Sequence, residues 1–164
     1  MIQKILSGCL IIGMVLCSAC SNKKMPQTDP PLPQAEAASL WNYITAVLPY
    51  KDWAFWPDHQ GTYNSKAPHA PQHKIFVNTP ALESTGPPLQ YGSIIVKENL
   101  SPANELKAVT AMYKVKGYNP AAGDWFWAYY RPSGDPIKTG KVKSCITCHS
   151  PMADNDFILV HEFK

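Results

Sequence analysis

The sequence predicts one α+β domain made mainly of an antiparallel β-sheet with flanking helices. Three observations predict it. A length of 164 residues allows one core and short appendages. A content of 45% hydrophobic and 16% charged residues is too apolar for a disordered chain. Short β-branched and aromatic segments alternate with turns, to which 16 Pro and 9 Gly contribute.

The charge balance excludes one class of partner. The formal net charge is +3, and Arg131 is the only arginine. Phosphate backbones are usually bound by a clustered, Arg-rich basic face, so we expect no nucleic-acid partner.

The N-terminus indicates export. Lys4 precedes an apolar run over residues 5–16, which is too short for a comfortable membrane span and is typical of a signal peptide. The small residues before Cys20 resemble the lipobox of bacterial lipoproteins, although Cys17 stands where Leu is usual. We therefore expect a lipoprotein-type signal peptide over 1–19 and lipidation of Cys20; an ordinary secretory peptide is the alternative.

The segments after the signal peptide divide into a tether and a domain. Residues 20–35 are polar and rich in proline, so they cannot offset the entropy of ordering and form a flexible tether. Residues 36–164 form the domain. Ser21 and Asn22, with no Asp after Cys20, resemble lipoproteins sent to the outer membrane. The predicted location is the cell envelope, on the periplasmic side.

The first half of the domain contains one helix and one strand. Apolar residues at helical spacing predict an amphipathic helix over 35–48, which Pro49 ends. Residues 58–72 are polar and form an irregular loop. Alternation predicts a strand over 74–79, and Thr79-Pro80 then begins a short helical turn that ends near Gly86.

The second half supplies three more strands. Residues 92–98, 106–116 and 125–131 are rich in β-branched and aromatic residues. The connections between them are short, so these strands are predicted to pair antiparallel, with helices at both ends of the sheet.

The residues Cys145-Ile146-Thr147-Cys148-His149 form a CxxCH motif. This is the haem c attachment pattern: two thiols are spaced to meet two vinyl groups, and the adjacent His is the axial iron ligand. Cys145 and Cys148 are therefore predicted to bind a covalent haem c, and His149 its iron.

Two other readings of the motif stay open. A zinc site would combine Cys145, Cys148 and His149 with His161, although zinc sites usually take two ligand pairs. A redox CxxC would follow a thioredoxin-like strand.

Beyond the motif, residues 41–163 resemble the cytochrome P-460 family. The matching stretches are HKIFVN at 73–78, GSIIVKE at 92–98, residues 106–114, Gly123-Asp124-Trp125, and a terminal CxxCH followed by Asp154 and Asp156. The resemblance implies a mainly antiparallel, periplasmic haem c protein that is often a homodimer.

The resemblance also implies a role for Lys97. In that family, the lysine of this strand is bonded to a meso carbon of the haem, and Lys97 stands at the matching position. Period-two alternation puts it on one face with Ser93 and Ile95, whereas an edge-strand lysine in solvent is the alternative. A related branch, the cytochrome c-prime-beta proteins, has no cross-link and binds nitric oxide.

The residues that would face the open coordination position of the iron are harder to predict from the sequence. Related proteins often have an Arg where this chain has His73, which is predicted either to accept a proton from bound hydroxylamine or to lie on the surface. We expect His59 and His69 to face solvent. Met112 is expected in the core, and Met152 is too close to His149 to reach the opposite side of the iron. The aromatic residues between 125 and 130 either wall the haem or form plain core.

Three functions follow as expectations. The first is an enzyme, with Lys97 and His73 as catalytic residues, that oxidises hydroxylamine with or without nitric oxide and passes electrons to a soluble acceptor such as another cytochrome. The second is a nitric-oxide-binding protein without the cross-link. The third is an electron carrier with a sixth protein ligand.

Overall fold

The computed structural model describes residues 30–65 and 69–163 of the chain. The predicted signal peptide over 1–19 and the lipidation site Cys20 lie outside these residues and stay predictions. Within the described residues, no helix has the length and apolar character needed to cross a membrane.

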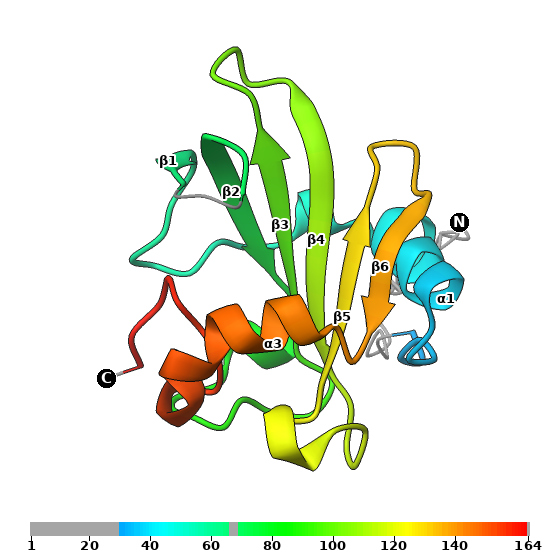
Figure 1. Ribbon diagram of the computed structural model, residues 1–164, viewed down its shortest axis with the longest axis vertical. Helices are drawn as coiled ribbons and strands as arrows, with labels where there is room; N and C mark the ends of the chain where they lie inside the picture. Colours follow the sequence, from blue (N-terminus) through cyan, green and yellow to red (C-terminus); the bar gives the residue numbers. More distant parts are fainter. Residues whose placement is uncertain (1–29, 66–68, 164) are drawn as a thin grey trace, which may run out of the picture.

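The centre of the fold is a six-stranded antiparallel sheet, whose strand order follows the chain order (Figure 1). The strands are β1 (Tyr63–Asn64), β2 (Gln72–Val77), β3 (Ile94–Leu100), β4 (Leu106–Lys114), β5 (Trp125–Tyr130) and β6 (Pro136–Gly140). The predicted fold class is confirmed.

The four predicted strands are present as β2 to β5, and two short strands were not predicted. β1 has only two residues and lies inside the polar stretch that we expected to be irregular. All residues of β6 except Gly140 are exposed, so it shows no alternation of buried and exposed positions. Both occupy the edges of the sheet, where pairing with a neighbour decides the structure more than the sequence pattern does.

The helices are shorter than the apolar pattern indicated. The expected helix over 35–48 is α1 (Ala37–Asn42) followed by a π-helix, η1 (Tyr43–Val47), and a 3₁₀ turn, η2 (Tyr50–Asp52), comes next. The turn after β2 is α2 (Thr79–Leu82), which ends before Gly86. The remaining elements are η3 (Pro120–Ala122), α3 (Lys143–His149) and η4 (Ser150–Asn155).

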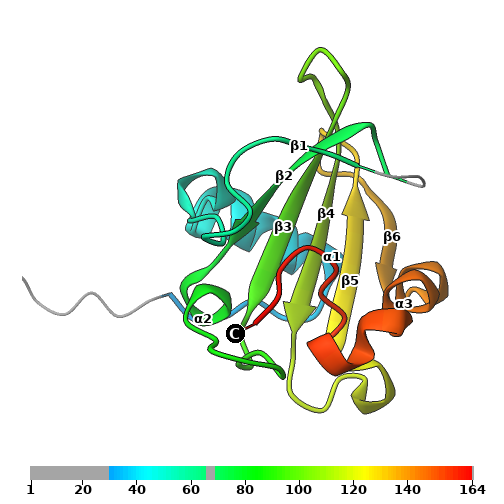
Figure 2. The ribbon, with the colours of Figure 1, turned by 90° about the vertical axis from the view of Figure 1, so that its left-hand side faces the viewer.

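The sheet separates two apolar cores. One lies between the sheet and the helices that start at α1, and includes Leu40, Phe76 and Tyr130. The other lies on the opposite face, where Trp127 and the partly buried Cys145 and Ile146 of α3 pack together. Figure 2 shows α1 and α3 on opposite sides of the sheet.

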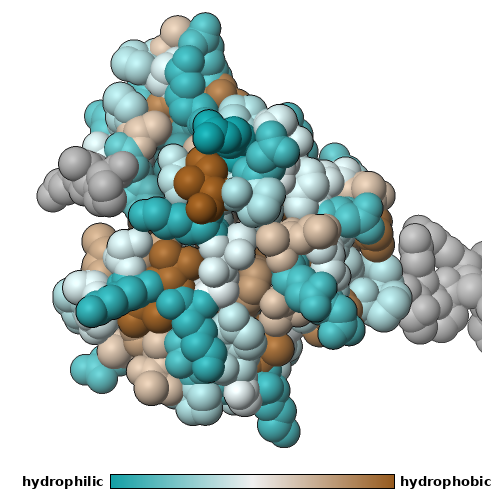
Figure 3. Space-filling view, turned by 45° about the vertical axis from the view of Figure 1, so that its right-hand side comes forward, coloured by the Kyte–Doolittle hydropathy of each residue, from teal (hydrophilic) through white to brown (hydrophobic). Residues whose placement is uncertain are grey.

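The outer surface is mostly polar. Figure 3 shows separate brown patches among hydrophilic atoms on the face it presents. The described large apolar residues that are exposed are scattered along the chain from Leu32 to Leu159.

Candidate functional site

The CxxCH motif forms the end of α3. Cys145 and Cys148 are three residues apart, which puts their side chains on neighbouring positions of one helix face. Both are free thiols; Cys145 is half-buried and Cys148 is exposed. Burial raises the pKa of the Cys145 thiol.

His149 is held with one ring nitrogen available. Its Nδ1 lies 2.8 Å from the carbonyl oxygen of Phe157. A carbonyl only accepts, so Nδ1 carries the proton and Nε2 keeps a free lone pair. Burial lowers the pKa of His149, which favours the neutral ring, and Trp127 contacts the ring edge to face, with centroids 4.8 Å apart.

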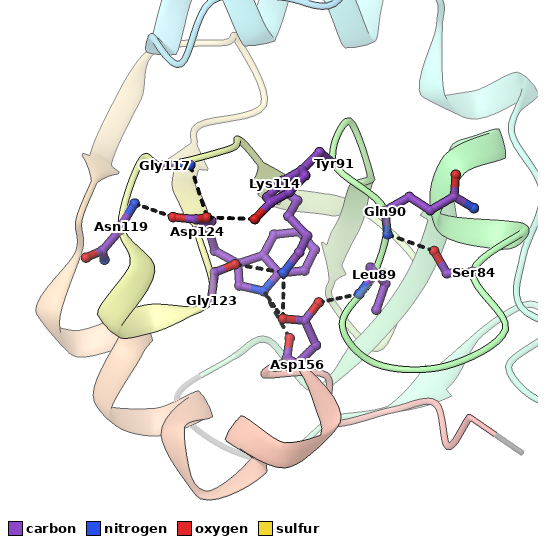
Figure 4. A network of polar contacts seen from close by, with 11 residues as sticks. Ser84, Leu89, Gln90, Tyr91, Lys114, Gly117, Asn119, Gly123, Asp124 and Asp156 are labelled. Carbon is purple, nitrogen blue, oxygen red and sulfur yellow. Dashed lines mark hydrogen bonds and ion pairs between the residues drawn. The ribbon is translucent and has the colours of Figure 1, made fainter.

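A buried ion pair anchors the segment that provides this carbonyl (Figure 4). Lys114 Nζ on β4 lies 2.7 Å from Asp156 Oδ1, and both side chains are 4% exposed. The backbone N–H of Leu89 donates to Asp156 Oδ2 at 2.7 Å, and Trp125 Nε1 donates to the Asp156 carbonyl at 3.0 Å. These bonds fix Asp156, and through it the next residue, Phe157, against the sheet.

Gly123 allows this close approach. Its φ is +65°, and a Cβ at this position would lie 2.9 Å from Trp125 Cδ1 and 3.1 Å from Asp156 Oδ1. Any larger residue would push the anchor away from β5.

Lys97 lies in the middle of β3 on the face covered by α3. Its register neighbours are Ile75 on β2 and Thr110 on β4. Burial lowers the pKa of its amine to about 8, while the nearby Cys148 acts in the opposite direction. Among the described residues, nothing makes a hydrogen bond or ion pair with Lys97 Nζ. The alternative of an edge-strand lysine is therefore wrong.

His73 is buried and fully hydrogen-bonded. It is 4% exposed, which contradicts the surface alternative. Its Nδ1 lies 2.6 Å from Ser65 Oγ, and its Nε2 lies 2.8 Å from His59 Nε2. Burial and then the Lys97 charge lower its pKa to about 4. His73 thus has no free ring nitrogen for a substrate.

The expectation that His59 and His69 face solvent is wrong. His59 is 7% exposed, and its ring stacks on Tyr63 with centroids 3.9 Å apart. His69 is half-buried, and burial followed by the Lys97 charge lowers its pKa to about 4. The polar composition of this stretch gave no indication that His59 contacts His73 on β2.

The other residues considered for iron binding behave as expected. Met112 is buried in the core on the α3 side. Met152 lies in η4, directly after the helix that carries His149. The aromatic residues of β5 divide between the two cores: Trp125 and Trp127 face α3, and Tyr130 faces α1.

The donor set fits a haem rather than zinc. Two free thiols and a neutral imidazole lie on one short helix, beside the half-buried amine of Lys97. On the same side, Trp127 Nε1 is buried and has no partner in the described chain; Trp53 Nε1 on the other side is in the same position. His161, the fourth zinc ligand considered, instead pairs with Asp58 at 2.7 Å. Residues 30–65 and 69–163 hold no group of three or more His, Cys, Asp or Glu arranged for a metal ion.

The redox reading also fits poorly. The strand before α3 is β6, an exposed edge strand of an antiparallel sheet. A thioredoxin-like motif belongs to a βαβ unit with parallel strands, which this sheet lacks.

Some site residues were missed. Ser65 and Asn99 are short polar side chains without a motif, and only the fold brings them to this face. Lys114 and Asp156 lie in stretches that supported the resemblance, but their pairing across 42 positions leaves no local pattern.

Comparison with known proteins identifies the family of the chain. A search of curated proteins finds no similar sequence. The family model described as Cytochrome P460 matches residues 48–160, which covers most of the domain and includes Lys97 and the CxxCH motif. The chain therefore belongs to the cytochrome P460 family of haem proteins.

Proposed function

We propose that this protein binds a covalent haem c through Cys145 and Cys148, with His149 as axial ligand, and that the haem, joined also to Lys97, oxidises hydroxylamine. The observation that carries the proposal is the half-buried amine of Lys97, which has no hydrogen-bond or ion-pair partner among the described residues, on the face that α3 covers. The bound haem would supply the electron-accepting iron.

The environment of Lys97 suits bond formation. An amine attacks carbon only when it is neutral, and burial lowers the pKa of this amine from 10.5 to about 8. A bond between the Lys97 nitrogen and a haem carbon replaces one N–H and one C–H bond and releases two protons and two electrons. A peroxide, reduced to water, is the class of oxidant that balances this step.

The remaining side chains orient the site and exclude water. The Phe157 carbonyl fixes the His149 ring. Trp127, Met112 and Ile95 belong to the core on the α3 side and make this part of the face apolar. The oxidation of hydroxylamine releases protons together with electrons, so the reaction needs both an electron acceptor and proton-accepting groups. A soluble redox protein such as another cytochrome is the proposed acceptor.

Replacement of Lys97 tests the proposal. Lys97→Leu should keep the haem, because both thiols and His149 remain, but lose the red-shifted ferrous absorption band and hydroxylamine turnover. Lys97→Arg should behave alike, since a guanidinium is a poor nucleophile. The exposed Lys107→Leu is the matched control.

Mass analysis of tryptic haem peptides gives an independent readout. In the wild type, the segment around Lys97 should be joined to the segment around His149. Separate peptides would overturn the cross-link and favour the second candidate, an uncross-linked nitric-oxide-binding protein. The apolar neighbours of Lys97, among them Ile75 and Ile95, favour that candidate, because an apolar face suits a small neutral ligand.

We further propose a lipid anchor at Cys20, a periplasmic location at the outer membrane, and a homodimer. A lipid-modified Cys20 would be the attachment left after removal of residues 1–19. Cys20→Ala should release the protein from membranes. A variant that still sediments with outer membranes after a salt wash would contradict the anchor.

A further inference from the structure

Ser65, His73 and His59 form one continuous hydrogen-bonded chain at the edge of the sheet. Ser65 Oγ contacts His73 Nδ1 at 2.6 Å, and the two Nε2 atoms of His73 and His59 are 2.8 Å apart. Both imidazoles are less than a tenth exposed, whereas Ser65 is half-buried. In the described part of the chain, His59 Nδ1 has no partner, so it is the open end.

This chain has two complete hydrogen-bonding patterns. In the first, Ser65 donates to His73 Nδ1, and His73 Nε2–H donates to His59 Nε2. In the second, His59 Nε2–H donates to His73 Nε2, and His73 Nδ1–H donates to Ser65 Oγ. Every contact is satisfied in both patterns because a neutral imidazole donates at one nitrogen and accepts at the other.

Burial keeps both rings neutral, because it is the largest cause that lowers the pKa of His59 and of His73. The Lys97 charge acts in the same direction only until the proposed bond to the haem forms, since the bonded nitrogen is no longer an ammonium group. The charge of His69 also lowers the pKa of His73, and the charge of His161 lowers the pKa of His59. Asp58 acts in the opposite direction and raises the pKa of His59.

We propose that His59 and His73 act together as a proton relay between the Lys97 side of the sheet and the solvent edge at Ser65. A proton arrives at His59 Nδ1, and the Nε2 proton of His59 passes to His73 Nε2. The Nδ1 proton of His73 passes to Ser65 Oγ, whose own proton leaves to water. One proton enters and one leaves, and no net charge is stored.

The relay rests on the proposed haem site but not on hydroxylamine as substrate. Cyanide is therefore the probe: hydrogen cyanide must lose a proton to bind ferric haem, and no oxidation is involved. Carbon monoxide binding to the ferrous protein releases no proton and reports access to the iron alone.

His59→Gln is the decisive variant. The glutamine amide can still hydrogen-bond to His73 Nε2 but cannot pass a proton on. We expect the cyanide association rate to fall about 10- to 100-fold and its solvent isotope effect to change, at an unchanged carbon monoxide rate. His161→Gln, which removes an imidazole outside the chain, should keep both rates.

Ser65 gives a test that spares the buried rings. Ser65→Ala should slow cyanide binding, and Ser65→Thr, which retains a hydroxyl, should restore it. Equal losses in the cyanide and carbon monoxide rates, or a normal cyanide rate in His59→Gln, would overturn the relay. Normal cyanide kinetics in the wild type without hydroxylamine turnover would instead count against the proposed substrate.

Discussion

Lys97 and Glu98 are consecutive residues of β3 whose side chains point to opposite faces of the sheet. Their hydrogen-bonding environments differ. Glu98 is 8% exposed on the α1 side, where Tyr50 donates its hydroxyl to it at 2.9 Å. Burial, and then the Glu98 charge, raises the pKa of Tyr50. Lys97 faces α3 without a hydrogen-bond partner in the described chain, and its pKa is lowered.

The difference extends to the two faces as a whole. On the α1 side, Tyr113 and Tyr130 each donate to a backbone carbonyl, that of Pro33 and that of Ala37. On the α3 side, Lys97 Nζ has no hydrogen-bond or ion-pair partner among the described residues. Buried polar atoms without a partner occur on both sides of the sheet, Trp53 Nε1 beside the α1-side core and Trp127 Nε1 in the α3-side core. The difference between the faces therefore lies in their charged groups: Glu98 is hydrogen-bonded, whereas Lys97 is left for a group outside the described chain.

The largest expected effect is the loss of covalent haem on the α3 side. Cys145→Ala and Cys148→Ala should each abolish full attachment, because each thiol is proposed to form one thioether. Denaturing gels stained for haem peroxidase activity measure this. Full staining in either single variant would contradict attachment at this motif.

The buried ion pair should come next. Lys114→Met leaves Asp156 as an unpaired buried charge, and this should cost about 3–5 kcal/mol in the free energy of unfolding. The exposed pair of Lys107 and Glu105 has the same 2.7 Å separation, so Lys107→Met is the control. Solvent screening makes that pair weak, and its loss should be barely measurable in urea denaturation. Equal losses of unfolding free energy in both variants would contradict the role of the Lys114–Asp156 ion pair as an anchor.

A smaller effect is expected on the α1 side. Tyr50→Phe removes the hydrogen bond to Glu98 and should cost about 1–3 kcal/mol, because a buried acceptor loses its partner. The haem absorption spectrum should not change. A changed spectrum would mean that the two faces are coupled and would contradict their separate roles.

The smallest expected effect concerns pH. Because the pKa of Lys97 is lowered to about 8, the neutral amine fraction rises as pH rises towards that value. In haem-loaded protein that is not yet cross-linked, the rate of cross-link formation should fall about tenfold per pH unit below 8 and level off above it. The shift of the ferrous absorption band follows this rate. A rate that keeps rising to pH 10.5 would show that Lys97 is not desolvated.

Local patterns predicted the centre of the fold well. Strands β2 to β5 carry dense β-branched and aromatic residues, and their alternation matches the two buried faces. The edge strands have no such pattern, and no local pattern marked the change from α-helix to π-helix at Tyr43. A regular apolar pattern arises where a strand is buried. The edge strands β1 and β6 are mostly exposed, so they lack that pattern.

The site was predictable where chemistry imposes a spacing. The spacing of Cys145, Cys148 and His149 matches the one that two thioethers and an axial ligand require in haem c proteins. The polar partners of His73 could not be predicted in this way. His59 is 14 residues from it, and their contact exists only because the loop returns to the edge of the sheet.

The order of the strands has a consequence for folding. Each strand pairs with its neighbour in the chain, so every strand pairing is local in the sequence; the longest connection, between Val77 and Ile94, contains α2. The contacts of Asp156 with Leu89 and Lys114 span 67 and 42 positions and belong to the slow, long-range class. We therefore expect the segment around Asp156 to dock after the sheet has formed. Until then, the thiols of Cys145 and Cys148 would be accessible for the proposed attachment of haem.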